Sequence, residues 1–196
     1  NTTEELEASV AKVLKTLEES GKSYAAPVLK GEEISRAFNL RKAGLGLLGN
    51  MVGDRKAVAC IEDTAVALGD LKDFIGEFTD IMKGFGQEAV YYAHAGAGEL
   101  HLRPILNLKR AEDVQLFRQI TTEVAELTKK YRGSFSGEHG DGRLRGEFIP
   151  LMVGAHVFEL FRRIKRTFDP EGIFNAGKVI DTPSMNTHLR YEPGHH

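Results

Sequence analysis

Two strand-like stretches joined by a glycine-rich turn constrain the fold of this chain most strongly. The stretches are residues 88–92 and 100–106, and the turn between them contains Gly96 and Gly98. A tight turn of this kind joins two antiparallel strands. Elsewhere, segments with helical spacing of apolar residues alternate with short strand candidates. This combination predicts an α+β fold with an antiparallel sheet flanked by helices, not a doubly wound parallel sheet.

The spacing of apolar residues predicts several helices. The clearest stripe lies in residues 111–131 and consists of Val114, Phe117, Ile120, Val124, Leu127 and Tyr131. Further helices are predicted over residues 3–20, 32–48, 70–83 and 155–168. Two more strands are predicted, at residues 23–29 and 57–61, the first of them at a sheet edge because it contains Pro27.

The length and composition of the chain exclude several classes of protein. With 196 residues we expect one domain, and a formal net charge of −2 argues against a dedicated nucleic-acid partner. No stretch is apolar for long enough to cross a bilayer. The single cysteine, Cys60, excludes an intrachain disulfide and is interpreted as a small buried apolar residue. We therefore expect a cytoplasmic location, with peripheral association at the inner membrane face as the alternative.

His94 and His101 stand at the two ends of the predicted hairpin turn. The ends of a hairpin lie close in space, so both rings can reach one side of it. Glycines at 96 and 98 allow the backbone to turn with positive φ, or allow a ligand to approach closely. Histidine is the commonest neutral metal ligand. The spacing alone fits two readings equally well, a shared metal or two strand-end histidines without a common partner.

A second polar motif, Gly137–Arg143, contains the adjacent pair Glu138-His139 in a glycine-rich loop. A carboxylate beside an imidazole can supply one metal ligand and one proton acceptor. Taken alone, the loop is better interpreted as a solvated charged segment than as a functional site. Taken with His94 and His101, it favours an open metal site with three protein ligands.

Other motifs are less specific. Gly44-x-Gly46-x-x-Gly49 matches a dinucleotide-binding pattern literally, but a helical segment rather than a strand leads into it, so we reject that reading. Arg41 and Lys56 flank the same region. Two converging cations would bind an anionic substrate, and two unrelated surface cations are the alternative.

Three ordered motifs resemble a known family. Residues 92–101, 137–142 and 169–178 are similar to the C-terminal cap domain of FAD-linked oxidases, which include D-lactate dehydrogenase, the glycolate oxidase flavin subunit and D-2-hydroxyglutarate dehydrogenase. The resemblance implies a ferredoxin-like α+β cap over residues 1–180. It also implies a separate FAD-binding domain in the same polypeptide. Residues 181–196 are then expected to form an extended tail or linker.

The resemblance also assigns roles to residues. It implies that His94, His101 and Glu138 bind a divalent metal, zinc or manganese. His139 would be the base that removes the hydroxyl proton of a D-2-hydroxy acid. Where related sequences carry Asp-Gly-Asn within the first motif, this chain has Ala97-Gly-Glu99.

The same resemblance extends to residues outside the histidine motifs. Arg41 and Lys56 would hold the substrate carboxylate, and Asn175 would lie toward the flavin. The tail, residues 181–191, resembles the subgroup fused to a downstream iron–sulfur domain, which implies an iron–sulfur cluster in that longer protein.

We therefore expect the substrate-binding cap fragment of an FAD-dependent oxidoreductase that converts a D-2-hydroxy acid of the lactate, glycolate or 2-hydroxyglutarate type to its 2-oxo acid. Without its FAD-binding domain, the fragment is expected to be inert. Two alternatives belong to other classes: a self-contained metal-dependent hydrolase that uses the same histidines and glutamate, and a non-catalytic module that binds small acids.

Overall fold

The chain forms two compact units, Asn1–Leu47 and Leu48–His196. The computed structural model describes residues 2–191 and 193, and for Leu45 the backbone alone. The first unit contains α1 (Thr3–Ser20) and most of α2 (Glu32–Gly49). Both predicted helices are confirmed. Because α2 continues through Gly49, a helix and not a strand leads into the glycine pattern at 44–49, which agrees with the rejection of a dinucleotide-binding motif there.

The start of α1 follows directly from its sequence. The Thr2 hydroxyl accepts a hydrogen bond from the Glu5 amide at 3.3 Å, and the Glu5 carboxylate accepts one from the Thr2 amide at 2.9 Å. This reciprocal capping satisfies amides that have no partner within the helix. The strand predicted at residues 23–29 is wrong, because the segment is irregular and Pro27 offers no amide proton for a sheet.

The second unit is built on an antiparallel sheet. Its strands are β1 (Lys56–Ala57), β2 (Ile61–Ala65), β3 (Ala89–His94) and β4 (Glu99–Leu106), and β4 pairs with each of the other three. The predicted hairpin is confirmed, with Tyr92 opposite His101. The strand predicted at 57–61 is interrupted after Ala57 and resumes at Ile61, so β2 continues through Glu62 and Asp63.

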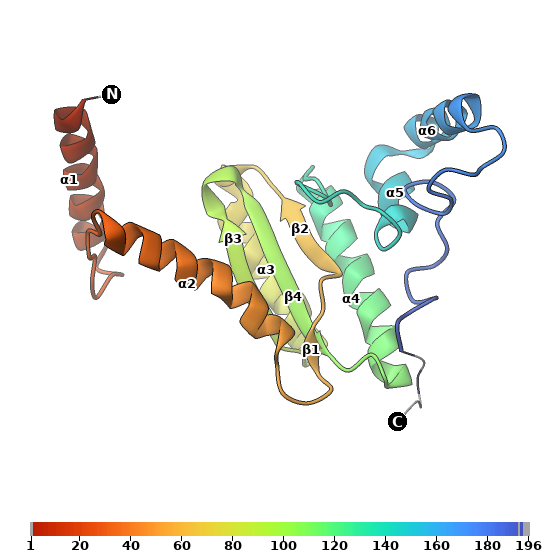
Figure 1. The fold of residues 1–196 in the computed structure, drawn as a ribbon, viewed down its shortest axis with the longest axis horizontal. Coiled ribbons are helices and arrows are strands. Elements are labelled where there is room, and N and C mark those ends of the chain that lie inside the picture. The colour runs from red at the N-terminus through yellow and green to blue at the C-terminus, as the bar shows by residue number, and fades with distance from the viewer. Residues whose placement is uncertain (1, 192, 194–196) are drawn as a thin grey trace. The chain divides into compact units, whose positions relative to one another are not determined.

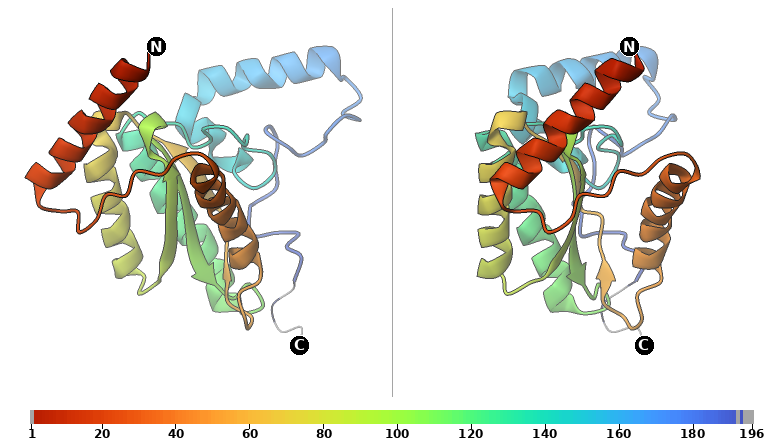
Figure 2. Two further views of the ribbon diagram at one scale, coloured as in Figure 1. Left: turned by 60° about the vertical axis from the view of Figure 1, so that its left-hand side comes forward. Right: turned by 90° about the vertical axis from the view of Figure 1, so that its left-hand side faces the viewer.

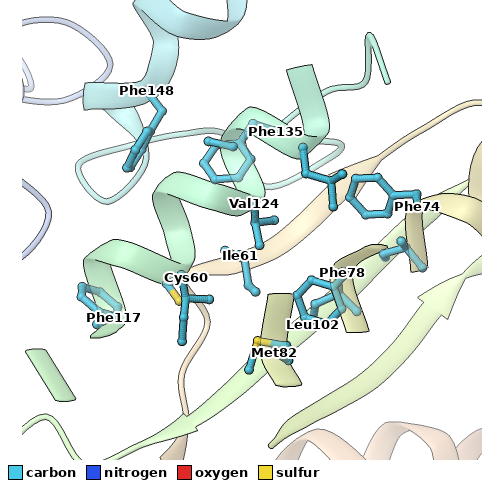
Figure 3. Packing of buried hydrophobic residues seen from close by; sticks show 14 of the residues in the cluster. Cys60, Ile61, Phe74, Phe78, Met82, Leu102, Phe117, Val124, Phe135 and Phe148 are labelled. Carbon is cyan, nitrogen blue, oxygen red and sulfur yellow. The ribbon is translucent and has the colours of Figure 1, made fainter. Parts of the chain in front are cut away.

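Two helices pack against the sheet, α3 (Leu71–Gly84) and α4 (Ala111–Lys130) (Figures 1 and 2). Figure 3 shows the core that they enclose, whose largest fully buried side chains include Phe74, Phe78, Phe117, Ile61 and Leu102. After α4 the chain returns to the sheet, where Ser134 forms an antiparallel bridge with Ala65. The order β2-α3-β3-β4-α4 with this returning segment is ferredoxin-like, and it confirms the expected α+β fold with an antiparallel sheet.

The remaining elements are short or peripheral to the sheet. They are the 3-10 turns η1 (Leu68–Asp70), η2 (Ala95–Ala97) and η3 (Gly146–Phe148), and the helices α5 (Ile149–Val153) and α6 (Ala155–Phe168). None of the helices in the described residues is both long and apolar enough to span a membrane.

The segment after α6 is extended but packed. Residues 181–191 contain no helix or strand, yet Met185 is only 3% exposed and belongs to the main core. The Met185 amide donates to the Glu147 carboxylate at 2.9 Å, and the Glu147 carboxylate also pairs with Arg118 at 2.9 Å. A domain boundary after residue 180 stays a prediction.

Cys60 is buried in the core, as its apolar surroundings in the sequence predict. Burial raises the pKa of its thiol from 9.0 to about 11. We expect alkylation by iodoacetamide at pH 8 to be about 100-fold slower in the native chain than in urea, because two pKa units reduce the thiolate fraction by that factor. The unfolded thiol loses its proton at a lower pH than the folded thiol, so this group reduces stability as pH rises from 9 to about 11. Equal labelling rates in the two states would contradict the burial.

Candidate functional site

The β3–β4 hairpin places two imidazoles on one face of the sheet. His94 is the last residue of β3, and His101 lies on β4 opposite Tyr92. Leu100 and Leu102 alternate with His101 and belong to the core, so the imidazoles lie on the face away from α3 and α4. The two rings are 5.1 Å apart and nearly perpendicular, at 80°.

Gly98 makes the tight turn between the histidines. Its φ is 73°, whereas Gly96 lies in η2 without a left-handed conformation. Gly98 is also bonded to Val66, whose amide donates a hydrogen bond to the Gly98 carbonyl at 3.0 Å. A Cβ atom at position 98 would lie 2.0 Å from the Val66 carbonyl oxygen. Positive φ, one of the two reasons expected for these glycines, is confirmed at Gly98, and Gly96 does not have it.

We expect Gly98→Ala to lower the free energy of unfolding by about 1–3 kcal/mol from backbone strain alone, and further through the clash with Val66. Urea denaturation would measure the loss. Gly96→Ala is the matched control, because a Cβ atom there would have no neighbour within 4 Å. Similar losses for both variants would contradict this account.

A carboxylate from the second motif completes the group. Glu138 lies in an irregular loop, and its Oε1 is 3.6 Å from His94 Nε2 and 3.8 Å from His101 Nε2. One ligand atom from each of these residues falls within 4.8 Å of the others. Ligand atoms around a tetrahedral zinc are roughly 3.4 Å apart, since each bond is about 2.1 Å long. The donor set therefore fits a single divalent metal after a small contraction.

The ionisation of His101 also suits a metal ligand. Burial lowers its pKa, Glu62 opposes this effect, and the neighbouring His94 and His139 lower the pKa further. A neutral ring is the form that binds metal. Its Nδ1 is buried without a hydrogen-bond partner in the described residues and lies 4.0 Å from Glu62 Oε1. Glu62 is thus the nearest carboxylate to the second ring nitrogen, at a distance too long for a hydrogen bond.

His139 stands beside this group with a different environment. Its Nε2 is 3.5 Å from Glu138 Oε1, and its Nδ1 is 3.7 Å from Glu62 Oε1. Its ring stacks on that of His101, with centroids 5.6 Å apart and an angle of 17° between planes. The side chain is 47% exposed, so a bound molecule can reach it. An accessible imidazole beside a buried carboxylate can accept a proton.

Three residues of this region were not predicted from the sequence. Glu62 lies opposite His101 in the sheet and forms an ion pair with Arg103. The Arg103 guanidinium also lies over the Tyr92 ring, 5.7 Å from its centroid. Asp63 follows Glu62 and is fully buried. The available signal was a pair of carboxylates directly after the apolar run at 57–61.

The other predicted residues lie elsewhere in the structure. Arg41 is an exposed residue of α2, in the first unit. Lys56 pairs with Leu106, five residues along β4 from His101, and its ammonium donates to the Met51 carbonyl. Asn175 has a φ of 48°, and its side-chain oxygen accepts from Lys178 at 3.1 Å. Asn175 also lines an apolar groove beside α6. The substrate and flavin contacts of these three residues stay predictions.

The fold and the site together define a class of protein, an antiparallel α+β domain with a histidine-and-carboxylate donor set on the sheet face away from α3 and α4. The chain belongs to the family of FAD linked oxidases, C-terminal domain, whose sequence model matches residues 1–179. The resemblance carried by the three motifs is thereby confirmed.

Its relatives are much longer proteins. The chain is 38% identical over 148 residues to D-2-hydroxyglutarate dehydrogenase of Pseudomonas putida, covering 76% of this chain and 14% of that protein. It is 37% identical over 157 residues to D-2-hydroxyglutarate dehydrogenase of Escherichia coli, covering 78% and 15%. Glycolate oxidase subunit GlcD of Bacillus subtilis is more distant, at 24% identity over 162 residues, covering 81% and 34%. The chain thus spans about one seventh of the length of these two D-2-hydroxyglutarate dehydrogenases.

Proposed function

We propose that this chain is the substrate-binding part of an FAD-dependent dehydrogenase that oxidises a D-2-hydroxy acid of the 2-hydroxyglutarate type to its 2-oxo acid. The observation that carries the proposal is the convergence of His94, His101 and Glu138 beside His139. The similarity to D-2-hydroxyglutarate dehydrogenases supports the choice of substrate class.

The donor set fits a divalent metal, zinc or manganese. Two neutral imidazoles and one carboxylate are ligands that both ions accept, and three protein ligands leave positions open for a substrate. When bound, the metal would hold the carboxylate and hydroxyl of the hydroxy acid and lower the pKa of that hydroxyl. His94 and Glu138 are partly exposed, which leaves one side of the group accessible.

His139 is placed to accept the hydroxyl proton of a substrate held at this group. Its Nε2 faces Glu138, while Glu62 lies near its Nδ1 and stabilises the imidazolium that forms. When bound in the assembled protein, FAD supplies the acceptor for the hydride on the adjacent carbon. The isolated chain is therefore expected to bind the acid without oxidising it.

The proposed partners follow from the same role. An FAD-binding domain of the same polypeptide would face the open side of the site. Arg41 and Lys56 would hold the substrate carboxylate after that assembly, and Asn175 would lie near the flavin. A downstream iron–sulfur domain would take up the electrons. Of these partners, the flavin domain has the stronger support, because it follows from the family itself.

Isothermal titration calorimetry on the purified chain tests the proposal. The chain is first stripped with a chelator and titrated with Zn²⁺ or Mn²⁺, and then with D-2-hydroxyglutarate. We expect metal binding near one equivalent, and binding of the D-acid that requires the metal and exceeds that of the L-acid. Equal binding of both acids without metal would contradict the proposal, as would ester or phosphate hydrolysis by the metal-loaded chain.

A further inference from the structure

Asp63 has an unusual position for a carboxylate. It lies within β2, is fully buried, and has a φ of 88°. The pairing of β2 with β4 is irregular at this point, since Glu62 lies opposite His101 and Thr64 lies opposite the next residue, Leu100. Asp63 is therefore the extra residue of a β-bulge. Bulges redirect a side chain that regular alternation would send to the other face.

The redirected carboxylate binds the loop that carries Glu138 and His139. Its Oδ1 accepts from the Glu138 amide at 2.8 Å, and its Oδ2 accepts from the His139 amide at 3.0 Å. Oδ2 also accepts from the Ser136 hydroxyl at 2.7 Å. In addition, the Asp63 carbonyl accepts from the Gly137 amide at 2.7 Å. Each residue from Ser136 to His139 thus donates to this one residue.

We propose that Asp63 is a positioning residue, which fixes the backbone of residues 136–139 so that the Glu138 and His139 side chains face His94 and His101. This inference rests on the proposed function. It adds that the site depends on a bulge in β2, a strand that contributes none of the proposed metal ligands.

The alternative role for Asp63, as a metal ligand, fits the contacts less well. One of its oxygens lies within 4.8 Å of ligand atoms of Glu138 and His139. Both oxygens, however, are already occupied by the amide and hydroxyl donors, and Arg145 Nη2 donates to Oδ2 at 3.3 Å. A carboxylate that accepts this many hydrogen bonds has little capacity left for a metal.

Arg145 connects Asp63 to the far side of the loop. Its guanidinium donates to the Gly140 carbonyl at 2.8 Å and to the Glu62 carbonyl, and the residue is 5% exposed. Residues 136–140 are therefore held from both ends by the Asp63–Arg145 pair. The loop also passes close to Asp63 at Gly137, where a Cβ atom would lie 3.3 Å from Asp63 Oδ1.

The test compares Asp63→Asn with the wild-type chain by two measurements. Asparagine keeps the size and tolerates positive φ, but its amide nitrogen accepts no hydrogen bond. Hydrogen exchange on the metal-free chain reports the Glu138 and His139 amides directly. Zn²⁺ titration then reports the ligand geometry. The remaining asparagine oxygen still accepts one of the two amides, so we expect exchange to accelerate at the other amide. We expect the Zn²⁺ dissociation constant to rise by about 10–100-fold.

Two further variants separate positioning from stability. Ser136→Ala removes one donor and leaves the Asp63–Arg145 pair intact, so it keeps the test available if Asp63→Asn does not fold. We expect it to raise the Zn²⁺ dissociation constant by about fivefold. Met185→Ala creates a core cavity and should lower the melting temperature without changing Zn²⁺ affinity.

The outcomes are distinct. Unchanged amide exchange in Asp63→Asn would overturn the inference. If Asp63→Asn does not fold, an unchanged Zn²⁺ dissociation constant in Ser136→Ala would overturn it instead. So would faster exchange with wild-type Zn²⁺ affinity, or an equal loss of affinity in Met185→Ala. If the wild-type chain binds no metal, the proposed metal site fails on its own. The exchange data then still decide whether Asp63 holds the loop.

Discussion

Replacing His94 by alanine should raise the dissociation constant for Zn²⁺ by at least about 100-fold. The substitution removes one of three proposed ligands, and even residues that only orient a ligand change metal affinity by about 10–100-fold. The His94 side chain is 44% exposed and lies at the end of a strand, so its loss should leave the core packing unchanged. Calorimetric titration of the purified chain measures the affinity, and circular dichroism confirms the fold.

His156 provides the matched control for this experiment. It is an exposed histidine of α6, within the same unit as His94. We expect His156→Ala to bind Zn²⁺ with wild-type affinity. If the two alanine variants lose affinity equally, or if neither loses any, the assignment of His94 as a ligand is incorrect.

Replacing His139 by alanine should lower the turnover of the D-2-hydroxy acid by about 10²–10⁴-fold in the full-length flavoprotein, because proton transfer by a positioned side chain contributes that much. His139 is not one of the three proposed ligands, so its removal should leave Zn²⁺ affinity of the chain close to that of wild type. Steady-state kinetics with an artificial electron acceptor would measure the turnover.

The pattern of the two measurements separates the roles of neighbouring residues. His139→Ala should lose turnover and keep the metal, whereas His94→Ala should lose both. Loss of metal without a separate effect on turnover in His139→Ala would make His139 a ligand instead of a base. Full turnover in His139→Ala would remove it from the chemistry.

The proximity of His94 and His101 could be predicted from the sequence because it depends on local geometry. His94 and His101 flank a turn whose glycine spacing indicates a hairpin, and the hairpin brings their rings to 5.1 Å. Helices with a regular apolar stripe, such as α4, were predicted to within a residue or two. In each case a short-range pattern determines the local structure.

The sheet side of the site could not be predicted, since it depends on long-range pairing. Glu62 and Asp63 are charged residues within a strand that is buried on both sides, and no apolar alternation marks them. The free-energy cost of burying these two charges is offset by ion pairs with residues far along the chain, Arg103 for Glu62 and Arg145 for Asp63. The bulge that turns Asp63 toward the loop exists only once β2 has paired with β4. The same limit applies to the strand wrongly predicted at 23–29, which pairs with no strand among the described residues.

The burial of Met185 has a practical consequence for dividing proteins of this kind into domains. The sequence model of the family ends its match at residue 179, whereas the hydrophobic core extends to a side chain six positions later. Gly146 approaches the same segment closely, since a Cβ atom there would lie 2.3 Å from Thr182. A truncation at the end of the family match would therefore expose the core on that side. The family match and the buried core therefore end at different residues, and a shortened chain should retain Met185.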